Sequence, residues 1–358
     1  MMHALARPLH VAALLAVCVV VATACGTKPA TGEGGGDGGA TQLDTTQVDS
    51  TQTDGAAASD SGTTDAQEQA RTSLRAVTFN VLCSFCVFKA YDKWPERVPY
   101  LQQIIAEHNA DLLGLQELMF VWDDKDEVGD MVAKLPGFAA LYYISPKDEG
   151  PLPAYADATI YYRKSRFTLV DSGFFWLSPT PDKPYSSGFS AKGSLPHIVA
   201  WAALKDVRRK GREVLFVNTH FDNSSPSQAK SAPLFVERLA TLRKSSAGAP
   251  NPLRDVVAMG DFNSTPSTVA YKTLITPFGG IAPLIDSQVL APQIEKIGTE
   301  EDQSDWLVKD GIDHIFVVQT PEGVTPTVKR WAVDLRRFGP NNFFPSDHWP
   351  VLTEVQYP

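Results

Sequence analysis

An apolar run that ends abruptly in an acid and an amide restricts the folds open to this chain. Residues 256–259 are predicted to form a buried β-strand, and a glycine at 260 and a proline at 266 bound the turn that follows. Asp261 and Asn263 fall in that turn. A carboxylate and a carboxamide at the end of a buried strand are costly unless other groups hydrogen-bond to them. The fold is therefore expected to bring polar partners to this strand end.

Most of the other predicted strands also end beside a polar side chain. Strands are predicted at residues 75–82, 112–116, 158–163, 174–177, 197–204, 213–220, 312–318 and 351–355, and helices from residue 94, at 128–135 and at 227–244. The polar residues are Asn80, Glu117, His220, Asp261, Asn263, Asp313, Asp347 and His348. Many strands, few helices and no internal linker predict that residues 74–358 form one α+β domain of two packed mixed β-sheets with outer helices.

The strand-end residues indicate a metal site only when they are taken as a set. A single Asp or His at a strand end is usually a turn former or a satisfied hydrogen-bonding group. Several carboxylates that meet at one sheet edge would repel one another unless a cation or strong donors lay among them. Because oxygen ligands dominate the set, Mg²⁺, Mn²⁺ or Ca²⁺ is favoured over zinc.

The N-terminal part of the chain is predicted to be an export signal followed by a tether. Residues 1–24 have the charged, apolar and small-residue order of a signal peptide, and the apolar run is short for a membrane span. The residues before Cys25 resemble a bacterial lipobox, with Ala22 in place of the usual Leu or Val, so Cys25 is the expected lipidation site. Plain secretion and an uncleaved anchor are the alternatives. Residues 25–73 have almost no large apolar side chains and are expected to be disordered.

The charge of the remaining domain does not indicate a nucleic-acid partner. Residues 1–73 hold eight of the 41 acids and three of the 32 bases, which leaves 33 acids and 29 bases, or a net charge of −4. A nucleic-acid binder usually has a basic surplus. The basic residues at 208–212 surround Gly211 between two predicted strands and are interpreted as a hairpin turn. Nucleic acid stays a possible substrate, because a local basic groove could be hidden in the total.

Two cysteines remain in the domain, in the sequence Cys83-Ser-Phe-Cys86. A disulfide is the expected state outside the cytoplasm, since two cysteines cannot complete a zinc site. A redox-active dithiol is the alternative. Because the pair follows the first strand, it is expected to clip a loop at the rim of the site.

Six motifs, in order, resemble those of the endonuclease/exonuclease/phosphatase superfamily. They are Thr-Phe-Asn80-Val, Leu-Gln-Glu117, Asn-Thr-His220, Gly-Asp261-Phe-Asn263-Ser-Thr-Pro, Ile-Asp313-His and Pro-Ser-Asp347-His348-Trp-Pro-Val. The resemblance covers about residues 74–357, and Trp94-Pro-Glu-Arg97 is similar to a bacterial branch called metal-dependent hydrolases. It implies a four-layered α/β/β/α sandwich and metal-assisted hydrolysis of a phosphate ester.

The resemblance also implies which residues hold the metal. Glu117 would be the principal Mg²⁺ ligand, with Asn80 beside it. Asp347 would bind the metal or a water molecule.

The remaining motif residues would carry the chemistry. Asp261 would orient or deprotonate the attacking water, and Asn263 would hold a phosphoryl oxygen. His220 would donate to a non-bridging oxygen, while His348, polarised by Asp313, would stabilise the charged transition state.

Three positions depart from the family pattern or carry less information. His197 stands where the family often has an Arg that clamps phosphate, and His cannot reproduce the bidentate fork. His197 is either a weaker, pH-dependent donor or a structural residue, and Arg163 is a candidate substitute clamp. His314 follows Asp313 directly, so strand alternation predicts that it points away from the site.

The predicted function is an extracytoplasmic, divalent-metal-dependent phosphoesterase that acts on a phosphodiester or phosphomonoester. It is expected to be a monomer, lipid-anchored at the bacterial envelope or secreted. A secreted nuclease acting on DNA or RNA is one alternative. A catalytically inactive binding lipoprotein is another, although every motif residue expected of an active enzyme is present.

Overall fold

The computed structural model describes residues 72–86, 90–118, 126–144, 154–189, 195–277, 282–298 and 311–358. The predicted signal peptide, Cys25 and the predicted tether up to residue 71 lie outside these ranges. Within them, no helix combines the length and the apolar composition needed to cross a membrane.

The first sheet has seven strands in the order β10-β12-β13-β1-β2-β4-β3. They are β1 (Leu74–Asn80), β2 (Leu112–Gln116), β3 (Phe138–Ile144), β4 (Ala154–Arg163), β10 (Ile294–Ile297), β12 (Thr327–Asp334) and β13 (Val351–Gln356). Helices α2 (Trp94–His108) and α3 (Glu127–Lys134) cover its outer face. Their apolar stripes, which include Val98, Leu101 and Met131, pack on Phe79 and Leu113 of the sheet.

The second sheet has six strands in the order β5-β6-β7-β8-β11-β9. They are β5 (Phe167–Trp176), β6 (Ile198–Asp206), β7 (Arg212–His220), β8 (Asp255–Asp261), β9 (Ile285–Asp286) and β11 (Asp313–Val317). Helices α4 (Ser225–Leu242) and α5 (Val269–Leu274) lie on its outer face, and the short elements η1 (Val207–Arg209) and α6 (Ser287–Leu290) follow β6 and β9. Phe235 and Leu239 of α4 are buried against Val217 and Ala258.

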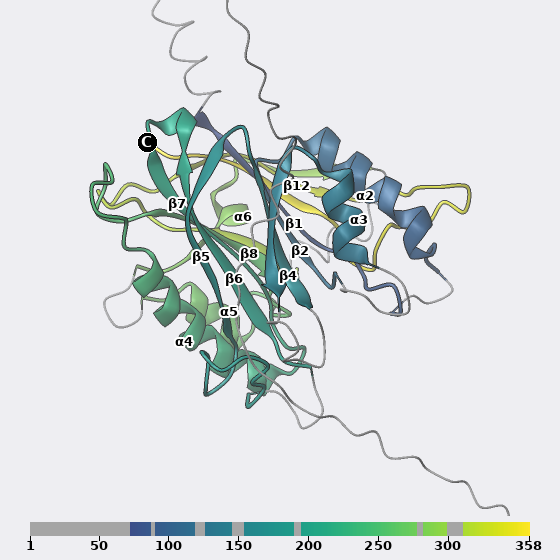
Figure 1. Ribbon diagram of the computed structural model, residues 1–358, viewed down its shortest axis with the longest axis horizontal. Helices are drawn as coiled ribbons and strands as arrows, with labels where there is room; N and C mark the ends of the chain where they lie inside the picture. The colour runs from purple at the N-terminus through teal and green to yellow at the C-terminus, as the bar shows by residue number, and fades with distance from the viewer. Residues whose placement is uncertain are drawn as a thin grey trace, which may run out of the picture.

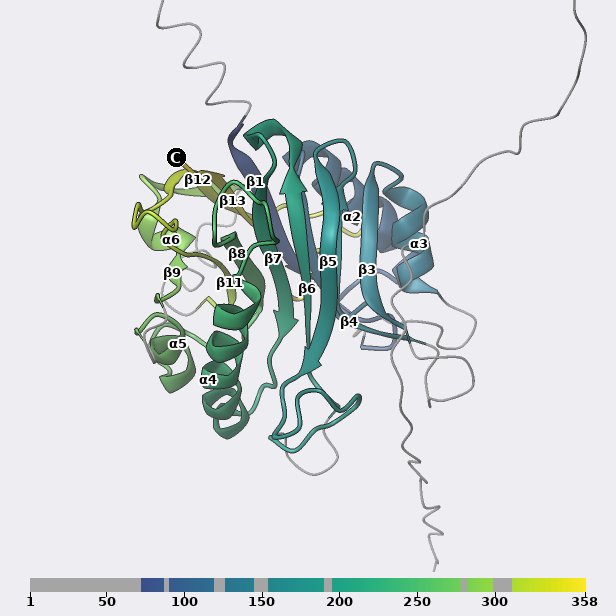
Figure 2. The ribbon, with the colours of Figure 1, turned by 60° about the vertical axis from the view of Figure 1, so that its left-hand side comes forward.

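The inner faces of the two sheets form the main core. Phe216 and Met259 of the second sheet meet Leu112, Ile160 and Val351 of the first, and all five are buried. Figures 1 and 2 show the resulting order of layers, with α2 and α3 on one side and α4 and α5 on the other. The predicted α+β sandwich of two mixed sheets with outer helices is confirmed.

Strand pairing brings the predicted polar ends to one edge. Residue Gln116 at the end of β2 pairs with Ala158 near the start of the antiparallel β4. In the other sheet, His220 pairs with Asp261 in the parallel β7–β8 pair, and Asp261 pairs with Asp313 in the antiparallel β8–β11 pair. Parallel strands end together and antiparallel strands begin where their neighbours end, so both kinds of pairing converge on this edge.

Four strands of the structure were not predicted, namely β3, β9, β10 and β12. In β12 a register shift between Val328 and Arg330 breaks the alternation that would identify a strand. The hairpin predicted at the basic cluster is present: β6 and β7 are antiparallel, and Lys210 and Gly211 both have positive φ in their connection.

Candidate active site

The turn after β8 holds Asp261 and Asn263 in a fixed geometry. At Gly260, φ is +151° and a Cβ atom would lie 2.0 Å from the carbonyl oxygen of Thr219, so only glycine fits. The Oδ1 atom of Asp261 accepts a hydrogen bond from the backbone N–H of Asn263 at 2.8 Å. Asn263 itself has a φ of 47°, and its side-chain amide donates to the carbonyl oxygen of Phe221 at 2.8 Å.

One hydrogen-bond donor and two imidazole nitrogens surround the other oxygen of Asp261. The Oδ2 atom lies 3.2 Å from the Nδ2 atom of Asn80, 3.4 Å from Nε2 of His220 and 3.6 Å from Nε2 of His348. Asp261 is 1 % exposed. These are the partners that the acid at the end of a buried strand requires.

Each of the two imidazoles has a carboxylate behind it. The Nδ1 atom of His220 lies 2.9 Å from Oδ1 of Asp157, and Nδ1 of His348 lies 2.8 Å from Oδ2 of Asp313. A carboxylate can only accept here, so each Nδ1 atom carries a proton and each Nε2 atom faces Asp261.

These contacts favour the charged form of both rings. Burial lowers the pKa of His220, but the charge and hydrogen bond of Asp157, together with Asp261, outweigh it and raise the pKa to about 10. Burial likewise opposes the charge of His348, yet Asp313 and Asp261 hold its pKa well above the usual value. The site therefore presents two imidazolium groups at neutral pH.

Glu117 has the surroundings expected of a metal ligand. It has a φ of 62°, and its carboxylate accepts one hydrogen bond on each oxygen, from Nδ2 of Asn80 at 2.9 Å and from the backbone N–H of Cys83 at 3.1 Å. Each oxygen keeps a free lone pair. The Asp157–His220 and Asp313–His348 pairs are already joined by hydrogen bonds, whereas the carboxylate of Glu117 is suited to a hard divalent cation. Asp347 is exposed at the same edge, next to His348.

The loop after β1 is held from two sides. Cys83 and Cys86 form a disulfide with Cα atoms 5.1 Å apart, and the loop passes beside Glu117 as expected. Arg97 of α2 is fully buried, and its guanidinium donates to the carbonyl oxygens of Val81, Leu82 and Pro345. It thus joins this loop to the one that carries Asp347 and His348.

The structure places His197 at the site and Arg163 away from it. The Nδ1 atom of His197 lies 3.0 Å from the carbonyl oxygen of His220. Arg163 ends β4 at the opposite edge of the sheet, where its guanidinium donates to Asn109 and Ala110. The prediction that Arg163 binds substrate is therefore wrong, because β4 begins at the site and runs away from it.

His314 points away from the site, as alternation predicted. Its Nδ1 atom lies 2.8 Å from Asp286 and its Nε2 atom lies 2.9 Å from the carbonyl oxygen of Ser264. Both partners are acceptors, so the buried ring holds two protons and anchors the loop beyond Asn263.

Asp157, Asp222 and Arg97 are parts of the site that the sequence did not identify. Asp157 directly precedes a predicted strand, which is the signal that could have identified it. That strand, β4, is antiparallel to β2, so its first residues lie beside Glu117. Asp222 stands two residues after His220. Arg97 belongs to the Trp94-Pro-Glu-Arg97 motif, but its role was not predicted, since its partners are carbonyl groups of loops distant in the sequence.

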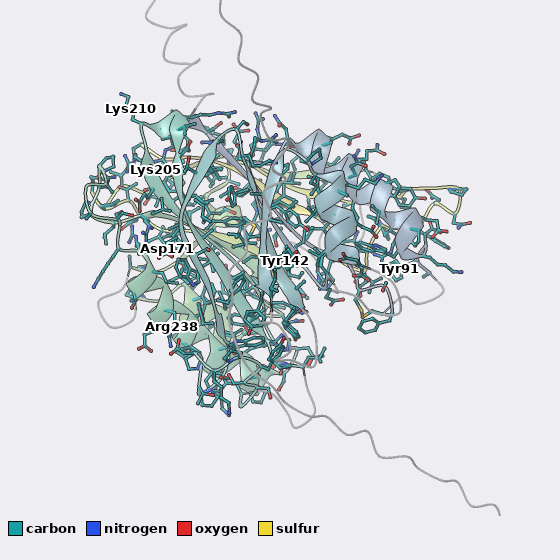
Figure 3. All side chains as sticks on the ribbon, in the orientation of Figure 1. Tyr91, Tyr142, Asp171, Lys205, Lys210 and Arg238 are labelled. Atoms are coloured by element: carbon teal, nitrogen blue, oxygen red, sulfur yellow. A yellow bond between two sulfur atoms is a disulfide. The ribbon has the colours of Figure 1, made fainter. Side chains whose placement is uncertain are left out.

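These side chains surround a cleft of about 360 Å³. Its lining residues are Glu117, Leu195, His197, His220, Asp222, Asn223, Asp261, Asn263 and His348. None of these nine is Arg or Lys. Lys210 of the basic hairpin and Lys205 of β6, both labelled in Figure 3, lie at the other end of the second sheet. Lys205 faces Glu213 in the β6–β7 strand register there.

Comparisons with known proteins agree with this geometry. A model of the endonuclease/exonuclease/phosphatase family matches residues 77–348. A member of that family from Bacteroides vulgatus is similar, with 26 % identity and a TM-score of 0.61 over 80 % of this chain and 100 % of the other. A mannosyl-6-phosphatase from Bacteroides thetaiotaomicron shares 26 % identity, with a TM-score of 0.58 over 79 % of this chain and 100 % of that one.

More distant structures share the fold alone. TDP2 from D. rerio, solved with a single-stranded DNA product, has 16 % identity and a TM-score of 0.56 over 80 % of this chain and 100 % of its own. No curated protein matches the chain.

Proposed function

The chain belongs to the endonuclease/exonuclease/phosphatase family, and from this premise we propose that it is a Mg²⁺-dependent phosphoesterase that hydrolyses its substrate by in-line attack of water. The observation that carries the proposal is the convergence of two carboxylate-backed imidazoles on Oδ2 of Asp261, at 3.4 and 3.6 Å. That arrangement places a base and two cationic donors around one point, as phosphoryl transfer requires.

The side chains divide the reaction between them. Asp261 holds the attacking water and takes its proton, because its carboxylate is fixed by Asn263 on one oxygen and faces the cleft residues with the other. The Nε2–H groups of His220 and His348 donate to the phosphate oxygens, on which negative charge increases in the transition state. Asn263 uses one amide hydrogen on Phe221 and keeps the second for a phosphoryl oxygen.

The carboxylate of Glu117, with Asn80 beside it and Asp347 at the same edge, is suited to a hard cation. A bound Mg²⁺ would neutralise negative charge on the phosphate and on the leaving oxygen. Oxygen donors favour Mg²⁺ over zinc, and members of this family depend on divalent metals.

The substrate class that the cleft supports best is a small phosphate monoester. A polyanion such as nucleic acid needs basic side chains along its path, and none of the nine lining residues is Arg or Lys. The mannosyl-6-phosphatase at 26 % identity supports a sugar phosphate in particular.

Replacement of the central residues tests the proposal. We expect Asp261→Ala and His348→Ala each to lower kcat/KM for p-nitrophenyl phosphate and its bis ester by about 10²- to 10⁴-fold with Mg²⁺ present, and the fold to persist. Chelation of the metal should have a comparable effect on the unaltered enzyme. Asp171→Ala, at an exposed position of β5, is the matched control. Unchanged turnover in either site variant would refute the assignment.

We also propose that the enzyme works outside the cytoplasm, held by a lipid on Cys25. The order of residues before Cys25 and the Cys83–Cys86 disulfide support this location. Expression of a Cys25→Ser chain should move the protein from the membrane fraction to the soluble fraction, and an unaltered distribution would count against the anchor.

A further inference from the structure

Asp222 is a buried carboxylate that the proposed mechanism does not use. It follows His220 by two residues, is 3 % exposed and lines the cleft. Its Oδ1 atom accepts a hydrogen bond from the backbone N–H of Ser224 at 2.8 Å. Its Oδ2 atom is buried and accepts no hydrogen bond from any residue that the structure describes. A buried carboxylate oxygen without a donor is costly, so this atom needs one from outside the described chain.

The neighbouring imidazole of His197 cannot supply that donor in its neutral form. Because the carbonyl oxygen of His220 can only accept, the Nδ1 atom of His197 carries the proton that joins them. The Nε2 atom of neutral His197 is then an acceptor, and it lies 3.9 Å from Oδ2 of Asp222. Burial is the main effect on the His197 ring and lowers its pKa, against Asp157 and Asp222, which raise it.

The groups that face this ring come from three segments. They are Asp157 on β4, the cationic His220 on β7, and Asp222 in the loop that follows β7. Asp157 is already engaged by His220 at 2.9 Å. Two acceptors, His197 Nε2 and Asp222 Oδ2, therefore stand side by side in the cleft wall without a shared proton.

We propose that His197 and Asp222 form a subsite that accepts hydrogen bonds from hydroxyl groups of the leaving group, so that the enzyme selects phosphate monoesters of sugars or other polyols. The inference rests on the proposed phosphoesterase function and deepens it. A phosphate oxygen would be repelled by the Asp222 carboxylate, whereas two neighbouring hydroxyls can each donate one hydrogen, to Oδ2 and to Nε2 respectively. At the position where the family often has a phosphate-binding Arg, His197 would thus recognise the hydroxyl groups of the leaving alcohol.

The test compares substrates that differ only in their hydroxyls. Mannose 6-phosphate and glucose 6-phosphate are set against n-hexyl phosphate, which has the same phosphate–methylene linkage and no hydroxyls. The unaltered enzyme should prefer at least one hexose phosphate in kcat/KM by more than 10-fold. In Asp222→Asn, which keeps an oxygen to cap Ser224 and puts an amide donor in place of Oδ2, that preference should fall by about 10- to 100-fold.

Each outcome separates the subsite from the proposed function. No metal-dependent hydrolysis of any of the three esters would defeat the proposed function itself. Hydrolysis of all three without preference, in the unaltered enzyme, would overturn the subsite whether or not the variant folds. Equal preference in the variant and the unaltered enzyme would overturn it too. A preference for 2-aminoethyl phosphate over ethyl phosphate that disappears in Asp222→Asn, with no hydroxyl effect, would assign the subsite to an ammonium group instead.

Discussion

Asp157 is the neighbour that most favours the charged form of the His220 imidazole. Burial lowers the pKa of this ring, but Asp157, which lies 2.9 Å from its Nδ1 atom, outweighs burial together with Asp261 and Glu117 and raises the pKa to about 10. Without that carboxylate, less would oppose the effect of burial, so the pKa of His220 would be lower. The proposed role of His220 as a cationic donor therefore also requires Asp157.

Removal of this carboxylate should move the pH profile toward acid. In Asp157→Asn we expect the pKa of His220 to fall, the alkaline limb of kcat/KM to shift to lower pH, and activity at pH 8 to drop by about 10- to 100-fold through loss of a charged donor. The measurement is kcat/KM against pH from 5 to 10.5. Asp171→Asn, on the exposed part of β5, should keep the original profile. An alkaline limb at the same pH in Asp157→Asn would contradict the assignment.

The same pair should make the fold lose stability in alkali. Because the folded pKa of His220 is raised from 6.5 to about 10, its contribution is fully present below pH 6.5 and is lost as the pH rises through 10. The melting temperature should consequently fall more between pH 7 and 10 in the unaltered enzyme than in Asp157→Asn. Equal slopes in thermal melts of the two proteins would show that the pair does not stabilise the fold.

At the scale of elements, helix α2 fixes two loops that strand pairing alone leaves apart. Its Arg97 donates to carbonyl oxygens after β1 and to Pro345 before β13, so one guanidinium joins the segments that carry Asn80 and His348. Burial lowers its pKa to about 10, against the opposing effect of nearby acids that include Glu127, Asp347 and Glu117. The planar guanidinium donates to these carbonyls from two separate nitrogens, whereas a lysine would have to serve all of them from a single nitrogen.

Arg97→Lys should therefore destabilise the domain. We expect the free energy of unfolding to fall by about 2–4 kcal/mol, because buried carbonyl groups lose their donor. Urea denaturation measures this change. Arg330→Lys is the matched control: Arg330 makes a half-exposed pair with Glu295, and such pairs contribute only about 0–1 kcal/mol. Similar losses in the two variants would refute the special role of Arg97.

At the scale of the whole molecule, a buried arginine ties the residues before β1 to the domain. Arg166 is fully buried, and its guanidinium donates to the backbone oxygens of Ser73 and Thr72 as well as to Asp111 and Asp206. Thr72 and Ser73, the two residues before the predicted boundary at 74, thus contact the domain.

Two truncations test whether these residues belong to the folded domain. A chain that begins at residue 72 should keep the melting temperature of the full chain, in accord with the prediction that the preceding residues are a tether. A chain that begins at residue 76 loses two of the four partners of Arg166, the backbone oxygens of Thr72 and Ser73, and the first residues of β1. We expect about 3–4 kcal/mol of lost stability, or roughly 6–16 °C in melting temperature. Equal melting temperatures for the chains that begin at residues 72 and 76 would show that residues 72–75 do not stabilise the domain.

Local sequence patterns determined most strand positions, the fold class and several candidate site residues. A buried strand is recognised by its apolar run, and the polar residue at its end is recognised by its position, so Glu117, His220, Asp261 and His348 could be identified without coordinates. The α+β sandwich followed from the number and spacing of such runs. Strands were missed where alternation was broken, as in β12 with its register shift.

Only the tertiary structure decided which groups meet. Whether the partner of His220 is Asp157 or Asp222 depends on strand register, and both acids are equally ordinary in the sequence. Arg163 lies at the far edge because β4 runs away from the site. Arg97 connects two loops because its carbonyl partners belong to segments distant in the sequence. A side chain's type is a property of the chain, whereas its neighbours are set by long-range pairing and burial, which no local pattern contains.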